Sequence, residues 1–62
     1  MQQNTWLSEK EVAQLTGISV STLQKNRFYR RGIPYSKVGR LVRYALKDVE
    51  AYLSAHQVPV EG

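Results

Sequence analysis

Residues 8–23 read SEKEVAQLTGISVSTL, and this stretch decides the fold. Ser8, followed three residues later by Glu11, forms a capping box, in which the hydroxyl and the carboxylate each accept a backbone amide that is free at a helix start. We therefore expect a helix from Glu9 to Thr16. Gly17 ends it, because glycine readily takes the left-handed conformation found just beyond helix C-termini.

A second helix is expected directly after the first. Ser19 is a typical N-cap residue, and Leu23 repeats the apolar phase that begins at Val20. These features predict a helix from Val20 to about Arg30, with Leu23 facing the core. The connection between the two helices is three residues long and contains a glycine. This is typical of the helix-turn-helix arrangement, although other pairs of antiparallel helices share the pattern.

A short β-hairpin is expected beyond Pro34, which breaks the helical pattern. Tyr35–Val38 and Leu41–Tyr44 are rich in β-branched and aromatic residues, and the Gly39-Arg40 pair between them suits a two-residue type II′ turn. We call this hairpin, residues 35–44, the wing. Alternation along its strands predicts an inner face with Val38, Val42 and Tyr44, outward-pointing Lys37 and Arg43, and Arg40 at the tip.

A third helix, from about Leu46 to Ala55, is expected after the wing, because apolar residues recur there at helical spacing. Asp48 in its first turn and His56 at its end suit the helix dipole, and we interpret His56 as an exposed helix cap. The expected fold is therefore mainly α with a small β-hairpin. It is a winged helix-turn-helix domain over residues 6–56, with three short helices, a two-stranded wing, and flexible tails at residues 1–5 and 57–62.

The distribution of charge favours an acidic partner. The 62 residues carry a net charge of +4, with a pI near 9.8. Val12–Lys47, which we call the acid-free stretch, holds eight of the nine Lys and Arg residues and none of the five acids. We expect these cations not to be neutralised inside the protein and to attract a polyphosphate such as double-stranded DNA. The alternative is a basic surface that is only solvated.

Several classes of function are not expected. The sequence has no cysteine, so it offers no disulfide and no thiolate metal site. The carboxylate pairs, Glu9 with Glu11 and Asp48 with Glu50, are two residues apart and point to different sides of a helix. An enzyme is therefore not expected, nor a metal, a cofactor or a small-molecule substrate. The apolar runs are too short to span a membrane and the N-terminus lacks signal-peptide features, which predicts a cytoplasmic protein.

The second helix is the candidate DNA-reading element, because the N-terminal part of such a helix meets base edges in the major groove. The side chains able to bond to base edges are Ser21, Thr22, Gln24 and Lys25. The candidate phosphate contacts are Arg27, Arg30 and Arg31. Helix capping would also explain Ser19 and Thr22. At least one of Phe28 and Tyr29 is expected to pack in the core, because so small a chain needs aromatic bulk.

The wing is the candidate second contact. Lys37, Arg40 and Arg43 project from a hairpin that needs packing against helices to be stable. A basic tip suits the adjacent minor groove, whose narrow A/T tracts attract arginine. The alternative is that these charges only protect an exposed strand edge.

Nearly the entire chain resembles one known family. The matching stretches are WLSEKEVAQLTGISVSTL (residues 6–23), GIPY (32–35), KVGRLVRY (37–44) and DVEAYL (48–53). They resemble the excisionase-like helix-turn-helix family, which is related to MerR-type winged-helix domains and includes phage excisionases and AlpA-type regulators. The resemblance implies a recognition helix and a wing in neighbouring DNA grooves. It maps Ser21, Thr22, Gln24 and Lys25 onto the recognition helix, and Lys37, Arg40 and Arg43 onto the wing.

At Asn26 the relatives often carry Trp, so Phe28 or Trp6 is expected to fill the core beneath the second helix. The resemblance also implies a role in prophage or mobile-element excision or in transcriptional control. Our leading hypothesis is an excisionase, a recombination directionality factor of which several copies bind near an attachment site, bend the DNA and help to recruit an integrase. The alternatives are a small prophage transcription regulator and a protein-interaction adaptor that does not use DNA.

Overall fold

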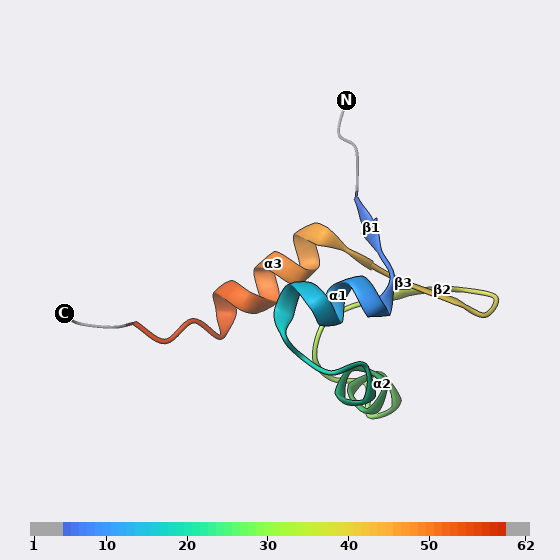
Figure 1. The fold of residues 1–62 in the computed structure, drawn as a ribbon, viewed down its shortest axis with the longest axis horizontal. Helices are drawn as coiled ribbons and strands as arrows, with labels where there is room; N and C mark the ends of the chain where they lie inside the picture. Colours follow the sequence, from blue (N-terminus) through green and yellow to red (C-terminus); the bar gives the residue numbers. More distant parts are fainter. Residues whose placement is uncertain (1–4, 60–62) are drawn as a thin grey trace.

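The computed structural model describes residues 5–59. Three helices and a three-stranded antiparallel sheet form the winged helix-turn-helix fold expected from the sequence (Figure 1). The elements in chain order are β1 (Trp6–Leu7), α1 (Glu9–Thr16), α2 (Val20–Phe28), β2 (Ser36–Val38), β3 (Leu41–Ala45) and α3 (Leu46–Ala55). The tails expected at residues 1–5 and 57–62 lie largely outside the described residues.

Local capping fixes α1, and its predicted bounds are confirmed. The Ser8 hydroxyl accepts the Glu11 amide at 3.2 Å, and the Glu11 carboxylate accepts the Ser8 amide at 2.8 Å. At the other end Gly17 has φ 78°, the left-handed conformation that favours glycine. A helix of only two turns is thus closed at both ends by its own side chains and backbone.

Helix α2 starts as predicted but ends at Phe28, two residues before the expected Arg30. Its end is a Schellman motif, in which the Arg30 amide bonds to the Arg27 carbonyl at 3.1 Å and the Arg31 amide bonds to the Asn26 carbonyl at 2.9 Å. Arg30 has φ 55° and is the one non-glycine residue with a clearly left-handed backbone among residues 5–59. The helix end went unpredicted because arginine occupies the position where glycine is the usual signal.

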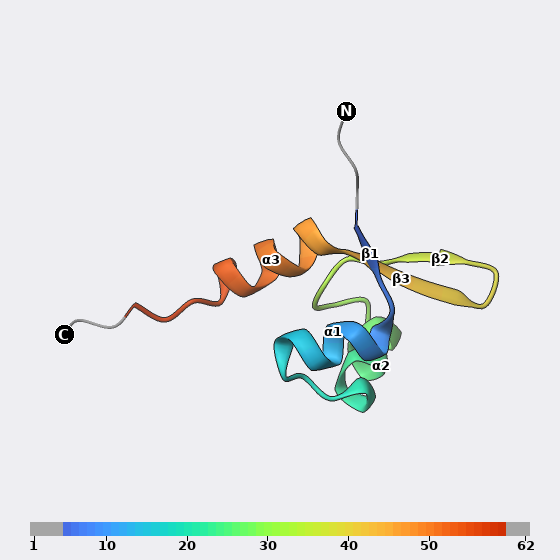
Figure 2. The same ribbon diagram turned by 45° about the horizontal axis from the view of Figure 1, so that its top comes forward.

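The sheet has the order β1-β3-β2, and β1 was not expected. Trp6 pairs with Ala45 and Leu7 with Tyr44, so a two-residue strand covers the inner end of β3. Strands β2 and β3 form the wing, which extends away from the helices (Figure 2). Its turn has φ 60° at Gly39 and a negative φ at the next residue, as a type II′ turn requires.

The pairing within the wing corrects the predicted faces. Val38 pairs with Leu41, and Lys37 pairs with Val42. Paired residues share a face of the sheet, so Val38 and Val42 lie on opposite faces. The Val38 side chain is 72% exposed, so the prediction that it lies on the inner face is wrong. A two-residue turn makes its two flanking residues partners, and this fixes the register. Lys37 and Arg43 consequently lie on opposite faces.

The core is small and lies where α1, α2, α3 and β3 meet. Its buried side chains are Val12, Leu23, Ile33, Tyr44 and Val49. The expectation that Phe28 or Tyr29 packs in the core is wrong, since they are 80% and 59% exposed. Trp6 is also half exposed, so Ile33 and Tyr44 supply the bulk beneath α2 instead. At Asn26 the side chain packs against Gly32, where an added Cβ would approach it to 3.1 Å.

Helix α3 has the predicted bounds, and its end confirms the interpretation of His56 as an exposed cap. The His56 amide reaches the carbonyl of Tyr52 at 3.2 Å, and its ring Nδ1 lies 2.9 Å from the same oxygen. At the other end the Leu46 amide donates to the Thr5 carbonyl at 2.8 Å. Within residues 5–59, none of the helices has the length and apolar character needed to cross a membrane.

Candidate nucleic-acid interface

Helix α2 presents one face to the core and the opposite face to solvent. Leu23 is buried, and Val20 and Arg27 lie on its side of the helix, both partly buried. At about 3.6 residues per turn, Ser21, Lys25 and Phe28 lie within about 40° of the direction opposite Leu23. All three are exposed, and we call them the outer face of α2.

Two further predicted base readers flank this outer face. Gln24 is exposed on the side of α2 that faces the wing. Thr22 is exposed on the other side, where its amide donates to the Ser19 hydroxyl at 3.1 Å and its own hydroxyl accepts from Ser19 at 2.9 Å. Thr22 therefore belongs to the N-cap of α2, and its hydroxyl proton is still able to donate outward.

Arg27 has a structural partner that the sequence did not reveal. Its Nε lies 2.7 Å from Oε2 of Glu9 and its Nη2 lies 3.2 Å from Oε1, a bidentate ion pair between α2 and α1. The Tyr44 hydroxyl donates to the same Oε2 at 2.9 Å, which brings β3 into the cluster. The guanidinium also lies 5.7 Å from the ring centre of Tyr35. The expectation that no acid neutralises the acid-free stretch therefore fails at Arg27.

The electrostatics of this Glu9–Arg27–Tyr44 triad keep the pair charged. Burial alone raises the pKa of Glu9, but hydrogen bonds from Arg27 and Tyr44 and the Arg27 charge outweigh it, so the pKa is lowered. The hydrogen bond to Glu9 raises the pKa of Arg27, and burial together with Glu9 raises that of Tyr44. The triad therefore links α1, α2 and β3, and β3 continues into the wing.

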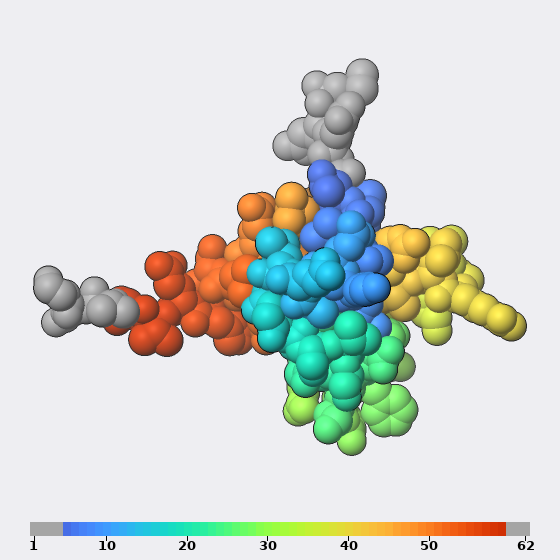
Figure 3. All heavy atoms as spheres, viewed as in Figure 1, coloured from blue at the N-terminus to red at the C-terminus, as the bar shows by residue number. Residues whose placement is uncertain are grey.

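A groove lies between α2 and the wing, floored by the start of α1. The residues lining it are Ser8, Glu9, Lys10, Val20, Gln24, Arg27, Arg40, Leu41, Val42 and Arg43. It brings together four predicted site residues from two elements and adds Lys10. Sequence reasoning passed over Lys10 because it precedes the acid-free stretch. In the space-filling view the wing and α2 project from α1 in different directions, with α1 between them (Figure 3).

The remaining predicted cations lie outside the groove. Arg30 and Arg31 are exposed just beyond α2, where Arg31 donates from Nε to Oδ1 of Asn26 at 3.2 Å and lies 5.2 Å from the ring centre of Tyr29. Lys37 is exposed on the wing.

Within the groove, Arg43 is partly buried and donates from Nη1 to the Val42 carbonyl at 2.8 Å. Arg27 is the one cation held in an ion pair between described residues.

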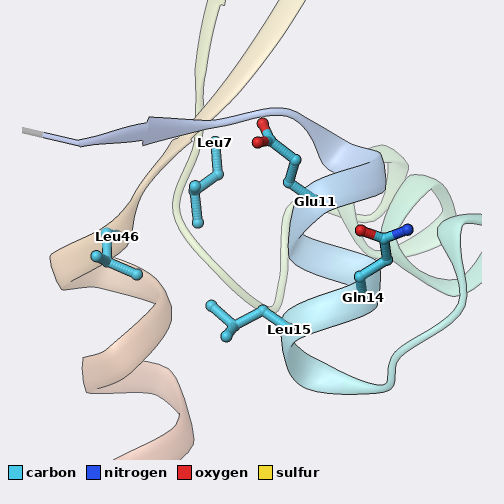
Figure 4. Close-up of a pocket in the computed structure, with 5 residues that line it drawn as sticks. All are labelled: Leu7, Glu11, Gln14, Leu15 and Leu46. Carbon is cyan, nitrogen blue, oxygen red and sulfur yellow. The ribbon is translucent and has the colours of Figure 1, made fainter.

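A second hollow lies between β1, α1 and the start of α3 (Figure 4). It is lined by Leu7, Glu11, Gln14, Leu15 and Leu46, and Leu15 points from α1 toward α3. Neither α2 nor the wing contributes to it, and none of its lining side chains is a cation. In the described part of the chain, no three His, Asp or Glu side chains gather as a metal site would need.

Comparison with known proteins identifies the family. The family model described as a helix-turn-helix domain matches residues 6–57, which include every helix and strand of the structure. Searches of curated proteins and of solved structures gave no match. The matched region carries the two-helix motif, the exposed outer face of α2 and the basic wing in one unit. The chain therefore belongs to the helix-turn-helix domain family and is a DNA-binding domain.

Proposed function

We propose that the chain binds double-stranded DNA sequence-specifically, with the outer face of α2 in the major groove and the wing in the adjacent minor groove. The groove between α2 and the wing carries this proposal. It holds Lys10, Arg27, Arg40 and Arg43, and so offers cations to the sugar-phosphate strand that separates the two DNA grooves. If α2 and the wing lie in neighbouring DNA grooves, the sugar-phosphate strand that separates these grooves runs between α2 and the wing.

The proposed contacts divide by position. Ser21, Lys25 and their neighbours Thr22 and Gln24 contact base edges, since all four are exposed along the first two turns of α2. Arg30 and Arg31, beyond the helix end, contact phosphate, and so does Arg27 through the N–H groups that Glu9 does not use. Arg40 at the turn, with Lys37 and Arg43, contacts the minor groove and its flanking phosphates.

For the biological role we propose an excisionase of a phage or mobile element that works with an integrase in the cytoplasm of a bacterium or a phage-infected cell. Support comes from the stretches that resemble excisionase-like proteins, and from the few phosphate contacts that one module can make. Several copies on neighbouring sites would then be needed for firm binding. A small transcription regulator would use the same surface, and an integrase gene beside this one would favour excision.

The experiment that tests DNA binding is selection of bound sequences from a random duplex library, followed by gel shifts on the recovered sequence over a range of salt. We expect a recovered motif and an affinity that falls as salt rises, with a slope of about 0.9 per neutralised phosphate. Replacing Lys25, Arg40 and Arg43 with Ala should weaken binding and reduce the slope by about 0.9 for each phosphate contact that is lost.

Lys47→Ala is the matched control, because Lys47 is an exposed cation on α3 outside the groove. It should leave the slope nearly unchanged. Failure to recover any motif, or a triple variant that binds as the unaltered protein does, would refute the proposal. If the triple variant bound no DNA but still bound a protein partner as the unaltered protein does, the adaptor hypothesis would be favoured instead.

A further inference from the structure

Phe28 has the largest exposed fraction of any large apolar side chain that the structure describes, at 80%. It is neither at the edge of the core nor in a loop. It lies on the outer face of α2, one turn beyond Lys25 and two turns beyond Ser21. A phenyl ring thus occupies the same line of the helix as two proposed base readers.

A neighbouring aromatic ring contacts Phe28 on one side. Tyr29 meets Phe28 edge to face, with ring centres 5.2 Å apart and an interplanar angle of 87°. The Arg31 guanidinium in turn lies 5.2 Å from the centre of the Tyr29 ring. Such packing restricts the ring before any partner arrives, so less freedom is lost when a partner covers it. The ring is therefore partly restrained by Tyr29, and most of its surface is open to a partner.

The charge around Phe28 indicates which partner covers it. Lys25, Arg30 and Arg31 are its exposed charged neighbours in sequence, and the acid-free stretch places no carboxylate near it along the chain. An apolar protein surface would leave these cations without partners, whereas DNA neutralises them. The apolar group that DNA presents in the major groove is the 5-methyl group of thymine, which phenylalanine can contact.

The spacing along α2 is also compatible with a base contact. Ser21 and Phe28 are seven residues apart, which is about 10.5 Å along a helix axis. This rise matches about three base-pair steps of about 3.4 Å each. A helix lying along the major groove would thus place Phe28 beside a base pair about three steps from the one that Ser21 faces.

We propose that Phe28 is a specificity-determining residue that recognises the 5-methyl group of a pyrimidine in the major groove. This inference rests on the proposed function, because it requires the outer face of α2 to contact base edges. Thymine is the expected source of the methyl group. 5-Methylcytosine carries the same group at the same ring position and would be recognised by the same contact.

The test uses the full chain and the duplex recovered by the random selection described above. Each thymine of the motif is replaced in turn by deoxyuridine, which removes the methyl group and keeps every hydrogen-bonding group of the base edge. We expect one position at which the unaltered protein loses about four-fold in affinity, the effect of one buried methyl. Phe28→Ala should bind the thymine and deoxyuridine duplexes equally. Val58→Ala, which shortens an equally exposed apolar side chain beyond α3, should keep the four-fold preference.

A parallel duplex series carries 5-methylcytosine in place of each cytosine. A gain that depends on Phe28 in this series, without any loss in the deoxyuridine series, would assign the methyl group to methylated cytosine. A motif with no methyl-sensitive position would overturn the inference while leaving the proposed function intact. A preference that persists in Phe28→Ala would also overturn it. A third result would also overturn it. If Phe28→Ala changed only the number of protein copies bound to each duplex, Phe28 would contact a neighbouring copy and not a base.

Discussion

At the scale of single residues, Arg30 is the most informative position. Its φ of 55° is one that glycine adopts freely and arginine adopts at a cost of about 1–2 kcal/mol. Such strain persists where the surrounding structure imposes the backbone conformation, as the two hydrogen bonds that close α2 do here, and strained residues often lie at functional sites. A glycine would close α2 equally well and without strain, so the arginine points to a contact that its side chain makes.

We therefore expect Arg30→Gly to stabilise the fold by about 1 kcal/mol and to weaken DNA binding, with a salt slope smaller by about 0.9. Urea unfolding and gel shifts measure the two effects. Arg31→Gly is the matched control, because it removes the neighbouring cation at a position with negative φ. It should not stabilise the fold. A destabilised Arg30→Gly variant, or one that binds DNA as the unaltered protein does, would contradict the assignment.

Glu9 carries a second prediction at this scale. Its pKa is lowered in the folded protein, so its contribution to stability is present above the ordinary value of 4.5 and is lost as pH falls through the folded pKa. Glu9→Gln should lower the free energy of unfolding by about 1–3 kcal/mol at neutral pH, because the bidentate pair with Arg27 is lost.

Unfolding of both proteins in urea between pH 3 and pH 7 checks the Glu9 prediction. The difference between them should shrink in acid, below about pH 4.5. Glu50→Gln, which changes an exposed acid on α3, should run parallel to the unaltered protein. A constant difference across this pH range would show that the Glu9 charge does not stabilise the fold.

At the scale of elements, the Glu9–Arg27–Tyr44 triad links α2 to β3, the strand that continues into the wing. Tyr44→Phe removes the hydroxyl that donates to Glu9 and leaves the buried ring in place. We expect weaker DNA binding with an unchanged salt slope, since the two reading elements lose alignment and no phosphate contact is lost. Gel shifts at several salt concentrations measure this, with Tyr52→Phe on α3 as the control. A reduced slope would mean that the Tyr44 hydroxyl affects a phosphate contact, and would contradict a role in aligning α2 with the wing.

The elements also differ in how far the sequence predicts them. Ser8, Glu11, Gly17 and Ser19 act on amides within a few residues, and the helix ends that they govern were predicted correctly. Strand β1 was missed because two residues carry no pattern, and because their partners on β3, Tyr44 and Ala45, lie far along the chain from Leu7 and Trp6.

In the candidate interface, the exposure of Ser21, Gln24 and Lys25 follows from their helical phase relative to Leu23. The ion pair of Arg27 could not be predicted, because it joins residues 18 positions apart with no local signal. The exposure of Phe28 likewise depends on Ile33 and Tyr44 having filled the core. Long-range packing thus decided the features that the local sequence pattern did not contain.

At the scale of the whole molecule, α1 lies at the centre. In the view of Figure 1, α2 lies below it, the wing extends to the right and α3 extends to the left. A 62-residue domain has a free energy of unfolding of about 3–9 kcal/mol, so its five-residue core and the ion pair between Glu9 and Arg27 are both significant. The cations gather around α2 and the wing, whereas the hollow at Leu7, Leu15 and Leu46 lies between other elements. DNA should therefore meet one side of the molecule only.

The measurement that tests this account most directly is an NMR titration of the nitrogen-15-labelled chain with the duplex recovered by selection. We predict that the backbone amides of residues 20–31 and 37–43 shift strongly and that Lys10 shifts with them. Amides of residues 50–56 and of Leu15 should hardly change. Shifts centred on Leu7, Leu15 and Leu46, with α2 and the wing unaffected, would contradict the central claim that α2 and the wing together bind DNA.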